Sequence, residues 1–195
     1  MEYDINICNM ALSHCNTRPI MNMNEISFEA DVISSWYKHS VEKVIADIPW
    51  KFARKMIRLV KVTDDLEIPG WENTYKLPSD FVKVMAIQTE RSDEYTIPEN
   101  YEIMGDLICS NVGGAYMTYI CNSVEPGKYP VEFKTCVSLA LAHNICGLIT
   151  GSNSLANNIL GLYAEELRKA RFNNVVQEVK KATKDKRYPM SMNYP

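Results

Sequence analysis

Apolar residues between positions 130 and 174 follow two consecutive helical patterns, and the rest of the chain is organised around them. In the first pattern, over 131–149, an apolar residue recurs at every third or fourth position: Phe133, Val137, Leu141, Ile145 and Leu148. Cysteines and alanines occupy the other faces, so this helix should be buried on most sides. Pro130 suits its first turn, and Gly151 suits a left-handed cap at its end.

The second helical pattern starts after Ser152 or Ser154, either of which can cap it. It carries two apolar stripes, which consist of Leu155, Ile159 and Leu162 on one side and of Leu160, Tyr163, Leu167 and Ala170 on the other. One stripe can pack inside the subunit and leave the other for a neighbour, or both can fill one core. We take Leu155, Ile159 and Leu162 as candidates for a subunit interface. After Asn173 the apolar phase shifts, so the helix should bend or meet another surface.

Two further helices are expected near the N-terminus. A short one spans Asp4 to Cys15, with Ile5, Cys8 and Leu12 on one face. A longer one follows a cap at Asn24 or Ser27 and should end or kink at Pro49. Its buried stripe is predicted to contain Ile33, Tyr37, Val41, Val44 and Ile48.

A basic segment follows, in which every charged residue between positions 51 and 61 is positive: Lys51, Arg54, Lys55, Arg58 and Lys61. We predict a helix that starts at Trp50, with Trp50, Ala53, Ile57 and Val60 on its apolar face. The basic face then has three interpretations. It can bind nucleic-acid phosphates, meet an acidic patch on another protein, or simply face solvent.

Alternating residues between positions 71 and 126 predict a small antiparallel sheet. Strands are expected over 81–87 and 115–121, with a hairpin over 101–109 that turns at Gly105-Asp106. The chain is therefore predicted to be an α+β protein, mainly an α-helical bundle with this sheet inserted. Residues 1–70 and 127–183 should form the helical body, and 71–126 the β-subdomain.

Residues 184–195 are predicted to form an extended tail, because two prolines interrupt them and no helical period is present. The tail begins with three basic residues and continues with aromatic and methionine residues at alternate positions: Lys184, Lys186, Arg187, Tyr188, Met190, Met192 and Tyr194. In an extended strand the last four project to the same side. The tail is therefore our candidate for docking on a partner.

The length and composition of the chain are those of a globular protein that can bury a sizeable core. The 195 residues are 46% hydrophobic and 23% charged with a net charge of -3, which excludes a chain-wide polycation. The charge is uneven, because nearly all charged residues between 90 and 106 are acidic. We see no signal peptide and no long apolar run, so we expect neither export nor a membrane span. The six cysteines should then be free, buried thiols.

The search for catalytic chemistry yields no catalytic, cofactor-binding or metal residue. Metalloprotease, phosphate-loop, nucleophile-elbow and dinucleotide motifs do not occur in the sequence. Cys136, His143 and Cys146 share about 80° of one helix face and are three soft ligands, but a thiol-lined core explains them as well. Asp64, Asp65 and Glu67 can gather a cation or form a solvated loop.

Four segments, in order, resemble the tail tubular protein A family, the head-to-tail adaptors of short-tailed phages. They are Ile48-Pro-Trp-Lys-Phe-Ala-Arg54, Tyr75-Lys-Leu-Pro-Ser-Asp-Phe-Val-Lys-Val84 after Trp71, Tyr101-Glu-Ile-Met-Gly-Asp-Leu-Ile108, and Phe133 to Ala170 with Leu-Ile-Thr-Gly-Ser at 148–152. The cysteine, asparagine and methionine content and the tail after 180 depart from the family.

The resemblance implies a structural protein of the virion neck, made in the host bacterial cytoplasm, and not an enzyme. Such adaptors form a ring of twelve between the portal protein and the tail nozzle and help to retain and conduct the packaged genome. The resemblance therefore implies the portal, the nozzle or next ring protein, and further copies of the chain as partners, with non-specific DNA contact in the channel. The alternative is a nucleic-acid-binding accessory module that uses the 51–61 basic face.

Overall fold

The computed structural model describes residues 2–62, 68–88 and 100–185, with side chains described as far as Asn174. Within these residues the chain is mixed α+β, with four helices and two small antiparallel sheets, about 50% helical and 20% strand. It divides into two compact units. One comprises Met1–Asp4 and Ser34–Pro130, and the other comprises Ile5–Ile33 and Val131–Pro195. We call these the β-containing unit and the helical unit.

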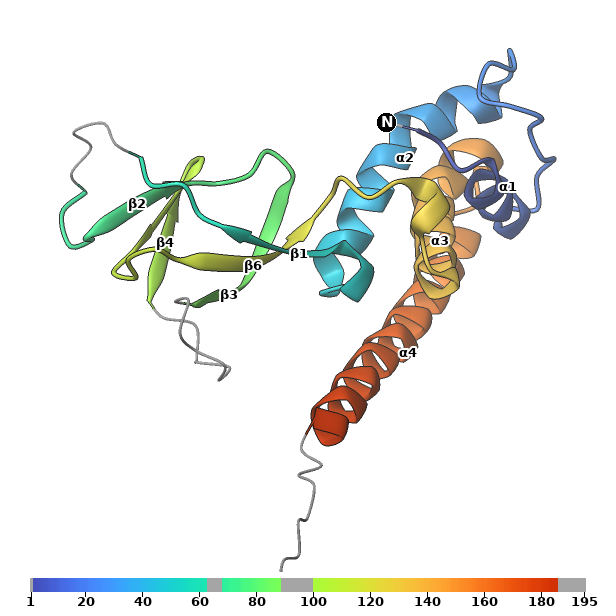
Figure 1. Ribbon diagram of the computed structural model, residues 1–195. Helices are drawn as coiled ribbons and strands as arrows, with labels where there is room; N and C mark the ends of the chain where they lie inside the picture. The colour runs from blue at the N-terminus through green and yellow to red at the C-terminus, as the bar shows by residue number, and fades with distance from the viewer. Residues whose placement is uncertain (1, 63–67, 89–99, 186–195) are drawn as a thin grey trace, which may run out of the picture. The chain divides into compact units, whose positions relative to one another are not determined.

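The helical unit is built around α3, Val131–Thr150, which contacts both α1, Ile5–His14, and α4, Asn153–Asp185 (Figure 1). Every residue from Cys136 to Ala142 is buried, so the prediction of a helix covered on most sides is confirmed. Leu148, predicted to belong to the buried stripe, is 55% exposed, because α3 nears its end there. By length and composition alone α3 also suits a membrane span, but its burial by α1 and α4 is the pattern of a core helix.

The turn between α3 and α4 follows the predicted capping chemistry. Gly151 has a φ of 70° and donates its N–H to the carbonyl of Gly147 at 3.1 Å, which closes α3 with a left-handed residue. Ser152 then caps α4, because its Oγ accepts the N–H of Leu155 at 3.2 Å. The turn therefore fixes where one helix ends and the next begins.

We expect Gly151→Ala to lower the free energy of unfolding of the helical unit by about 1–2 kcal/mol, since an L-residue is strained at positive φ. Gly161→Ala is the matched control, because Gly161 lies inside α4 with open space around its Cα. That change should stabilise the unit by about 0.5–1 kcal/mol. Urea unfolding followed by circular dichroism measures both, and equal effects of the two substitutions would contradict this account of the turn.

The helix α4 extends beyond its partner α3 (Figure 1). Its 33 residues span about 50 Å, whereas the 20 residues of α3 span about 30 Å. It continues as one helix to Asp185, so the apolar phase shift after Asn173 does not end it. Near that point Phe172 is 69% exposed.

Between the two units the chain passes through α2, Phe28–Asp47, which is divided at Ser34. Ser27 caps it, because its Oγ accepts the N–H of Ala30 at 3.4 Å, and its predicted stripe from Ile33 to Ile48 is confirmed as buried. The helix ends before Pro49, and the indole N–H of Trp50 donates to the carbonyl of Val44 at 2.7 Å. This bond folds the chain back onto the last turns of α2.

The helix predicted from Trp50 is wrong. After a single 3-10 turn, η1 Lys51–Ala53, the chain enters strand β1, Arg54–Arg58, which pairs with β6, Tyr116–Cys121, in an unshifted antiparallel register. Val60, assigned to the apolar helix face, is 74% exposed. Pairing with a strand about sixty positions away has overridden a local pattern that fitted a helix.

Two three-stranded sheets form the rest of the β-containing unit. The first has the order β1-β6-β3, with β3 at Phe81–Gln88, and the second has the order β2-β5-β4. The strands β2, β4 and β5 are Asn73–Lys76, Tyr101–Met104 and Leu107–Ser110. The predicted hairpin at Gly105 is confirmed, as are the strands near 81–87 and 115–121. The predicted single sheet is in fact two, and β1 lies outside the expected 71–126 boundary.

The two sheets share a core because one continuous segment belongs to both. Leu59 donates its N–H to the carbonyl of Ala115 beside β6, and Val62 donates to the carbonyl of Thr74 in β2, each at 2.9 Å. The side chains of both sheets then meet in one buried cluster: Leu59, Tyr75, Leu77, Val84, Ile87, Ile108, Val112, Ala115, Met117, Tyr119 and Cys121. A second 3-10 turn, η2 Pro126–Lys128, leads out of the unit toward α3.

Candidate functional site

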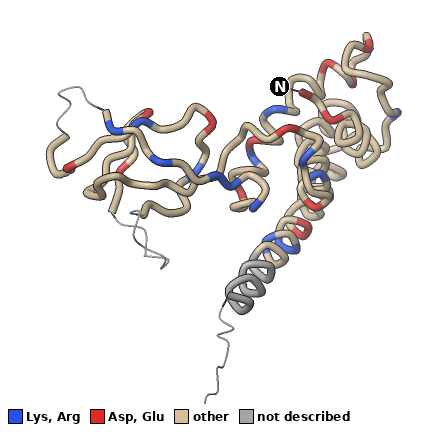
Figure 2. The backbone as a smooth tube through the Cα atoms, in the orientation of Figure 1, with Lys and Arg blue, Asp and Glu red and all other residues tan. Residues whose placement is uncertain are grey.

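The basic segment 51–61 has five charged residues, all of them positive, and Figure 2 shows lysines and arginines along β1. Because Arg54–Arg58 is a strand, its side chains alternate between two faces of the sheet and do not form one helical face. Lys55 and Lys61 are held by partners: Lys55 by Asp80 at 2.7 Å, and Lys61 by the carboxamide of Asn73 at 2.8 Å. The other face carries Arg54, Met56 and Arg58, with Met56 60% exposed.

Asp80 is the centre of a polar cluster that joins three strands of the first sheet. One of its carboxylate oxygens accepts bonds from Lys55 and from Ser123, both at 2.7 Å, and the other accepts the hydroxyl of Tyr119 at 2.9 Å. The backbone N–H of Asn122 also donates to the Asp80 carbonyl at 3.0 Å. These contacts tie the start of β3 to β1 and to the end of β6.

The cluster shifts the ionisation of its members. Burial raises the pKa of Asp80, but the hydrogen bonds from Lys55, Ser123 and Tyr119 outweigh burial and bring the pKa down to about 2. The bond to Asp80 raises the pKa of Lys55, while burial and the same carboxylate raise the pKa of Tyr119. Asp80 is therefore an anion and Lys55 a cation at neutral pH.

The cluster contains a serine beside a lysine, which invites comparison with a nucleophilic dyad. In such a dyad a neutral lysine accepts the serine proton. Here Lys55 Nζ donates to Ser123 Oγ at 2.7 Å, and Ser123 in turn donates to Asp80. Since the Lys55 pKa is raised, the amine stays protonated. The arrangement suits a structural clamp better than proton abstraction from Ser123.

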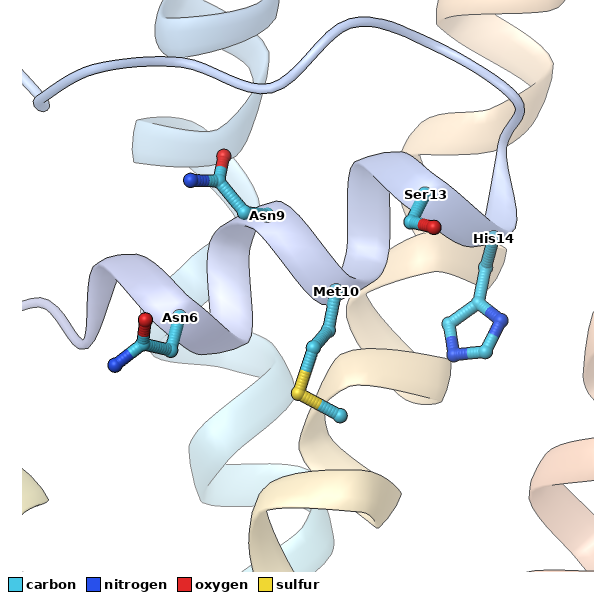
Figure 3. Close-up of a pocket in the computed structure, with 5 residues that line it drawn as sticks. All are labelled: Asn6, Asn9, Met10, Ser13 and His14. Carbon is cyan, nitrogen blue, oxygen red and sulfur yellow. The ribbon is translucent and has the colours of Figure 1, made fainter.

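A hollow of about 450 Å³ lies along the exposed side of α1, lined by Asn6, Asn9, Met10, Ser13 and His14 (Figure 3). Its polar groups are amides, a hydroxyl and an imidazole, and burial lowers the pKa of His14, which favours the neutral ring. The carboxamide of Asn9 is already used, because it bonds both the N–H and the carbonyl of Ile20, at 2.9 and 3.1 Å. The hollow therefore offers no charged group to a ligand.

The predicted soft ligands of α3 have separate environments. Cys136 and Cys146 are buried, and His143 Nδ1 donates to the carbonyl of Ala156 on α4 at 3.0 Å. Among residues with described side chains, no three His, Cys, Asp or Glu groups gather closely enough to hold a metal ion. The acidic residues Asp64, Asp65 and Glu67 lie outside the described residues.

All six cysteines are free and buried, so we expect a thiol reagent such as DTNB to find almost none in the native protein and six after denaturation. Cys15 should be the slowest, because burial and then its neighbour Cys146 raise its pKa from 9.0 to about 12. That shift lowers the thiolate fraction near neutral pH about a thousandfold. Rapid labelling of Cys15 in native protein would contradict the packing of α1 on α3.

The predicted subunit-interface residues of α4 are divided by the structure. Ile159 is 2% exposed and packs inside the unit, so it is not available to a neighbour, and the prediction for it is wrong. Leu162 is 49% exposed and Leu155 is half-buried, while Leu160, assigned to the other stripe, is 42% exposed. The buried residues among the described side chains of α4 are Ala156, Ile159, Tyr163 and Ala170. Ile159 belongs to one predicted stripe, and Tyr163 and Ala170 belong to the other.

The tail candidates lie beyond the described side chains. Lys184 falls within α4, but its side chain is not described, and Lys186, Arg187, Tyr188, Met190, Met192 and Tyr194 lie outside the described residues. The docking role of these seven residues stays a prediction. Of the acidic stretch, Glu102 and Asp106 are described, and both are exposed.

Sequence patterns did not identify the Asp80 cluster, since its members are far apart in the chain. The one available signal was Leu77-Pro-Ser-Asp80, in which Pro78 precedes an aspartate at a strand start. Comparison with known proteins adds no family, because no family model and no curated protein matches the chain.

Proposed function

We propose that the chain is a structural subunit of a phage neck, a head-to-tail adaptor that joins the portal protein to the tail as a ring of twelve. The observation that carries the proposal is where the four family-like segments fall. Two of them sit at connections, because Trp50 closes α2 before β1 and Gly151-Ser152 forms the turn between α3 and α4. The other two supply the Asp80 cluster and the β4–β5 hairpin. Residues that define the connections between helices and strands are those that two proteins with the same fold would share.

The helix α4 supports portal docking as part of this proposal. It extends past α3, its exposed Phe172 marks the start of that extension, and the sequence then becomes basic before the Tyr/Met tail. An extended, proline-containing tail loses little conformational entropy when it binds in a groove. We propose a groove of the portal, or the space between portal subunits, as the binding site for residues 184–195, with the same subunit or a ring neighbour as the alternative.

Truncation after Thr183 tests the docking step in a pull-down with assembled portal rings. We expect the truncated protein to lose most of its binding. A matched variant keeps the full length but replaces Tyr188, Met190, Met192 and Tyr194 with serine, and a second replaces only Lys184, Lys186 and Arg187. Unchanged portal binding by the truncated protein would show that the tail docks elsewhere. Electron microscopy of virions with six or fewer copies in this layer would refute the ring of twelve.

The acidic region between 90 and 106 is proposed as part of the platform for the nozzle or next ring protein. A deletion of 90–106 would remove β4 and uncover β5, so substitution is the cleaner experiment. Replacing Glu90, Asp93, Glu94 and Glu99 with glutamine or asparagine should leave portal binding intact and block nozzle attachment. Loss of both would contradict this division of roles.

The nucleic-acid alternative is weakened by the strand geometry of the basic segment. Lys55 and Lys61 are already held by side-chain partners, and Lys55 faces the opposite side of β1 from Arg54 and Arg58, so the basic residues do not form one continuous face. A binder of phosphates loses affinity steeply with salt. Filter binding of DNA between low and physiological salt therefore distinguishes the two functions, and tight, steeply salt-dependent binding by the isolated chain would favour the alternative.

A further inference from the structure

Two sheet edges of the β-containing unit are regular and open over their described residues. β1 lies at one edge of the order β1-β6-β3, and β4 lies at one edge of the order β2-β5-β4. Both pair with their single neighbour without any shift in register. A strand of this kind is a template for another strand.

The other two edges differ from these. The edge strand β3 has register shifts between Phe81 and Lys83 and between Val84 and Ala86, and irregularities of this kind discourage further pairing. The edge of β2 is already used, because Lys76 donates to Val60 and Val62 donates to Thr74. Only β1 and β4, among the described strands, combine a regular ladder with an open side.

The backbone of β1 can be oriented from the bonds at its end. Leu59 donates toward the β6 side, to Ala115 at 2.9 Å, and the carbonyl of Val60 accepts Lys76 from the opposite side at 3.2 Å. Backbone groups alternate in direction along an antiparallel strand. The N–H and C=O groups of Met56 therefore point away from β6, toward the open edge.

The two edges are complementary in charge and are both partly apolar. The charged residues of β1 are Arg54, Lys55 and Arg58, all basic. Those of the β4–β5 hairpin before Leu107 are Glu102 and Asp106, both acidic and exposed. Met56 is 60% exposed on β1, and Ile103 and Met104 are 42% and 37% exposed on β4.

These features decide which strand each edge accepts. Pairing β1 with a second β1 would place arginines opposite arginines, and like charges across a strand pair are destabilising. Pairing β1 with β4 places the exposed Arg58 near Glu102 and covers Met56 with an apolar side chain. One oxygen of Glu102 accepts the Trp71 indole at 3.1 Å, and a carboxylate has further acceptor positions.

We propose that the β1 edge of one copy of this chain pairs with the β4 edge of a second copy, so that one sheet continues across the interface. The contact is heterologous, since each copy gives one edge and receives the other, and repetition about an axis closes a ring. The pairing of two copies stands on the edges alone, while closure at twelve rests on the proposed function.

The expected strength of this contact follows from its size. A pairing of four or five residues buries less than the roughly 1,600 Å² of a standard protein interface. Free copies should therefore associate weakly. The fraction of copies with paired edges should rise when a portal holds the copies side by side and raises their effective concentration.

Cysteine trapping of the isolated, full-length chain tests the inference without a portal. Met56→Cys, Ile103→Cys and Met104→Cys are prepared as three separate proteins. The Met56→Cys protein carries a mass tag, and the two β4 variants do not. The six native thiols are buried and do not compete. Under mild oxidation, Met56→Cys mixed with a β4 variant should give tagged–untagged dimers well above those of either variant alone.

Strand pairing makes a stricter demand than proximity. Adjacent residues on a strand face opposite sides of the sheet, so only one of Ile103→Cys and Met104→Cys should crosslink efficiently to Met56→Cys. Lys83→Cys is the control, because Lys83 is exposed on the irregular edge β3 of the same sheet. Equal trapping at both β4 positions, equal trapping with Lys83→Cys, or dominant Met56→Cys homodimers would each overturn the proposal.

A charge exchange gives a second measurement. Arg58→Glu in the Met56→Cys chain, or Glu102→Arg in the β4 variant, should each reduce the yield of mixed dimers about two- to fivefold, and combining the two should restore it. Absence of rescue together with unchanged yields would show that the edges do not meet. Failure of this exchange with intact portal binding refutes the edge pairing alone, whereas loss of portal binding with normal crosslinking refutes the proposed function alone.

Discussion

Leu141→Ala is expected to lower the free energy of unfolding of the helical unit by about 2–5 kcal/mol, the largest effect we expect of a single substitution that only removes atoms. The side chain is fully buried in the middle of α3, within the run of buried residues that faces α1 and α4. Because α3 is packed against both α1 and α4, the surrounding side chains cannot collapse fully into the space left behind. Urea unfolding followed by far-ultraviolet circular dichroism measures the change.

Leu148→Ala is the control for this substitution, because it removes the same atoms from the same helix at a side chain that is 55% exposed. It should change the free energy of unfolding by no more than about 0.5 kcal/mol. Sequence periodicity placed both leucines on one buried stripe, so the pair also tests the structural correction at Leu148. Similar losses for the two substitutions would contradict the packing of α3.

Asp80→Asn should destabilise the β-containing unit by about 1–3 kcal/mol at neutral pH. It keeps the shape of the side chain but removes the charge that Lys55 meets at 2.7 Å and weakens the bonds from Ser123 and Tyr119. Trp36, Trp50 and Trp71 are the three tryptophans of the chain, and all lie in this unit. Tryptophan fluorescence in urea therefore reports on this unit and not on the helical one.

The pH dependence gives the sign of the Asp80 contribution. The folded pKa, about 2, lies below the ordinary value of 3.8, so the ionised carboxylate stabilises the folded state. The advantage of the natural protein over Asp80→Asn should be complete above the ordinary value and should shrink as pH falls from there through about 2. Glu125→Gln is the control, since its bond to Lys128 joins two exposed side chains and should contribute almost nothing. An advantage that grows on acidification would contradict the cluster.

The sequence predicted the helices whose burial follows from their own periodicity. The stripe of α2, the covered middle of α3 and the caps at Ser27, Gly151 and Ser152 all depend on residues close together in the chain. Helical hydrogen bonds and caps join residues that are close in the chain, so the local sequence is enough to predict them. The hairpin at Gly105-Asp106 succeeded for the same reason.

The basic segment failed because its structure depends on a distant partner. Trp50, Ala53 and Ile57 are spaced as on a helix, and nothing within the segment indicates that β6 will pair with it. Three of the apolar residues assigned to the helix face became a turn or a core-facing strand position, whereas Val60 became exposed. Strand pairing across about sixty residues cannot be inferred from spacing within ten.

The candidate sites show the same difference between features set by nearby residues and features set by distant partners. The basic residues were found correctly as a charged segment, but their pairing with Asp80 and Asn73 required the strand register. Ile159 was placed on an interface because two stripes on one helix look equivalent until the angle at which α3 lies against α4 is known. The open edges of β1 and β4 were invisible in the sequence, since an edge is defined by what does not pair with it.

The segment from Arg54 to Val62 has a consequence for how the β-containing unit unfolds. It pairs with β6 along its first part and with β2 along its last, so displacing this segment from one sheet disturbs its pairing with the other. Its Leu59 also lies in the core shared by both sheets. The two sheets should therefore behave as one foldon, and amides of β5 and β6 should exchange with solvent hydrogen through a common opening, although no β-ladder joins those two strands directly.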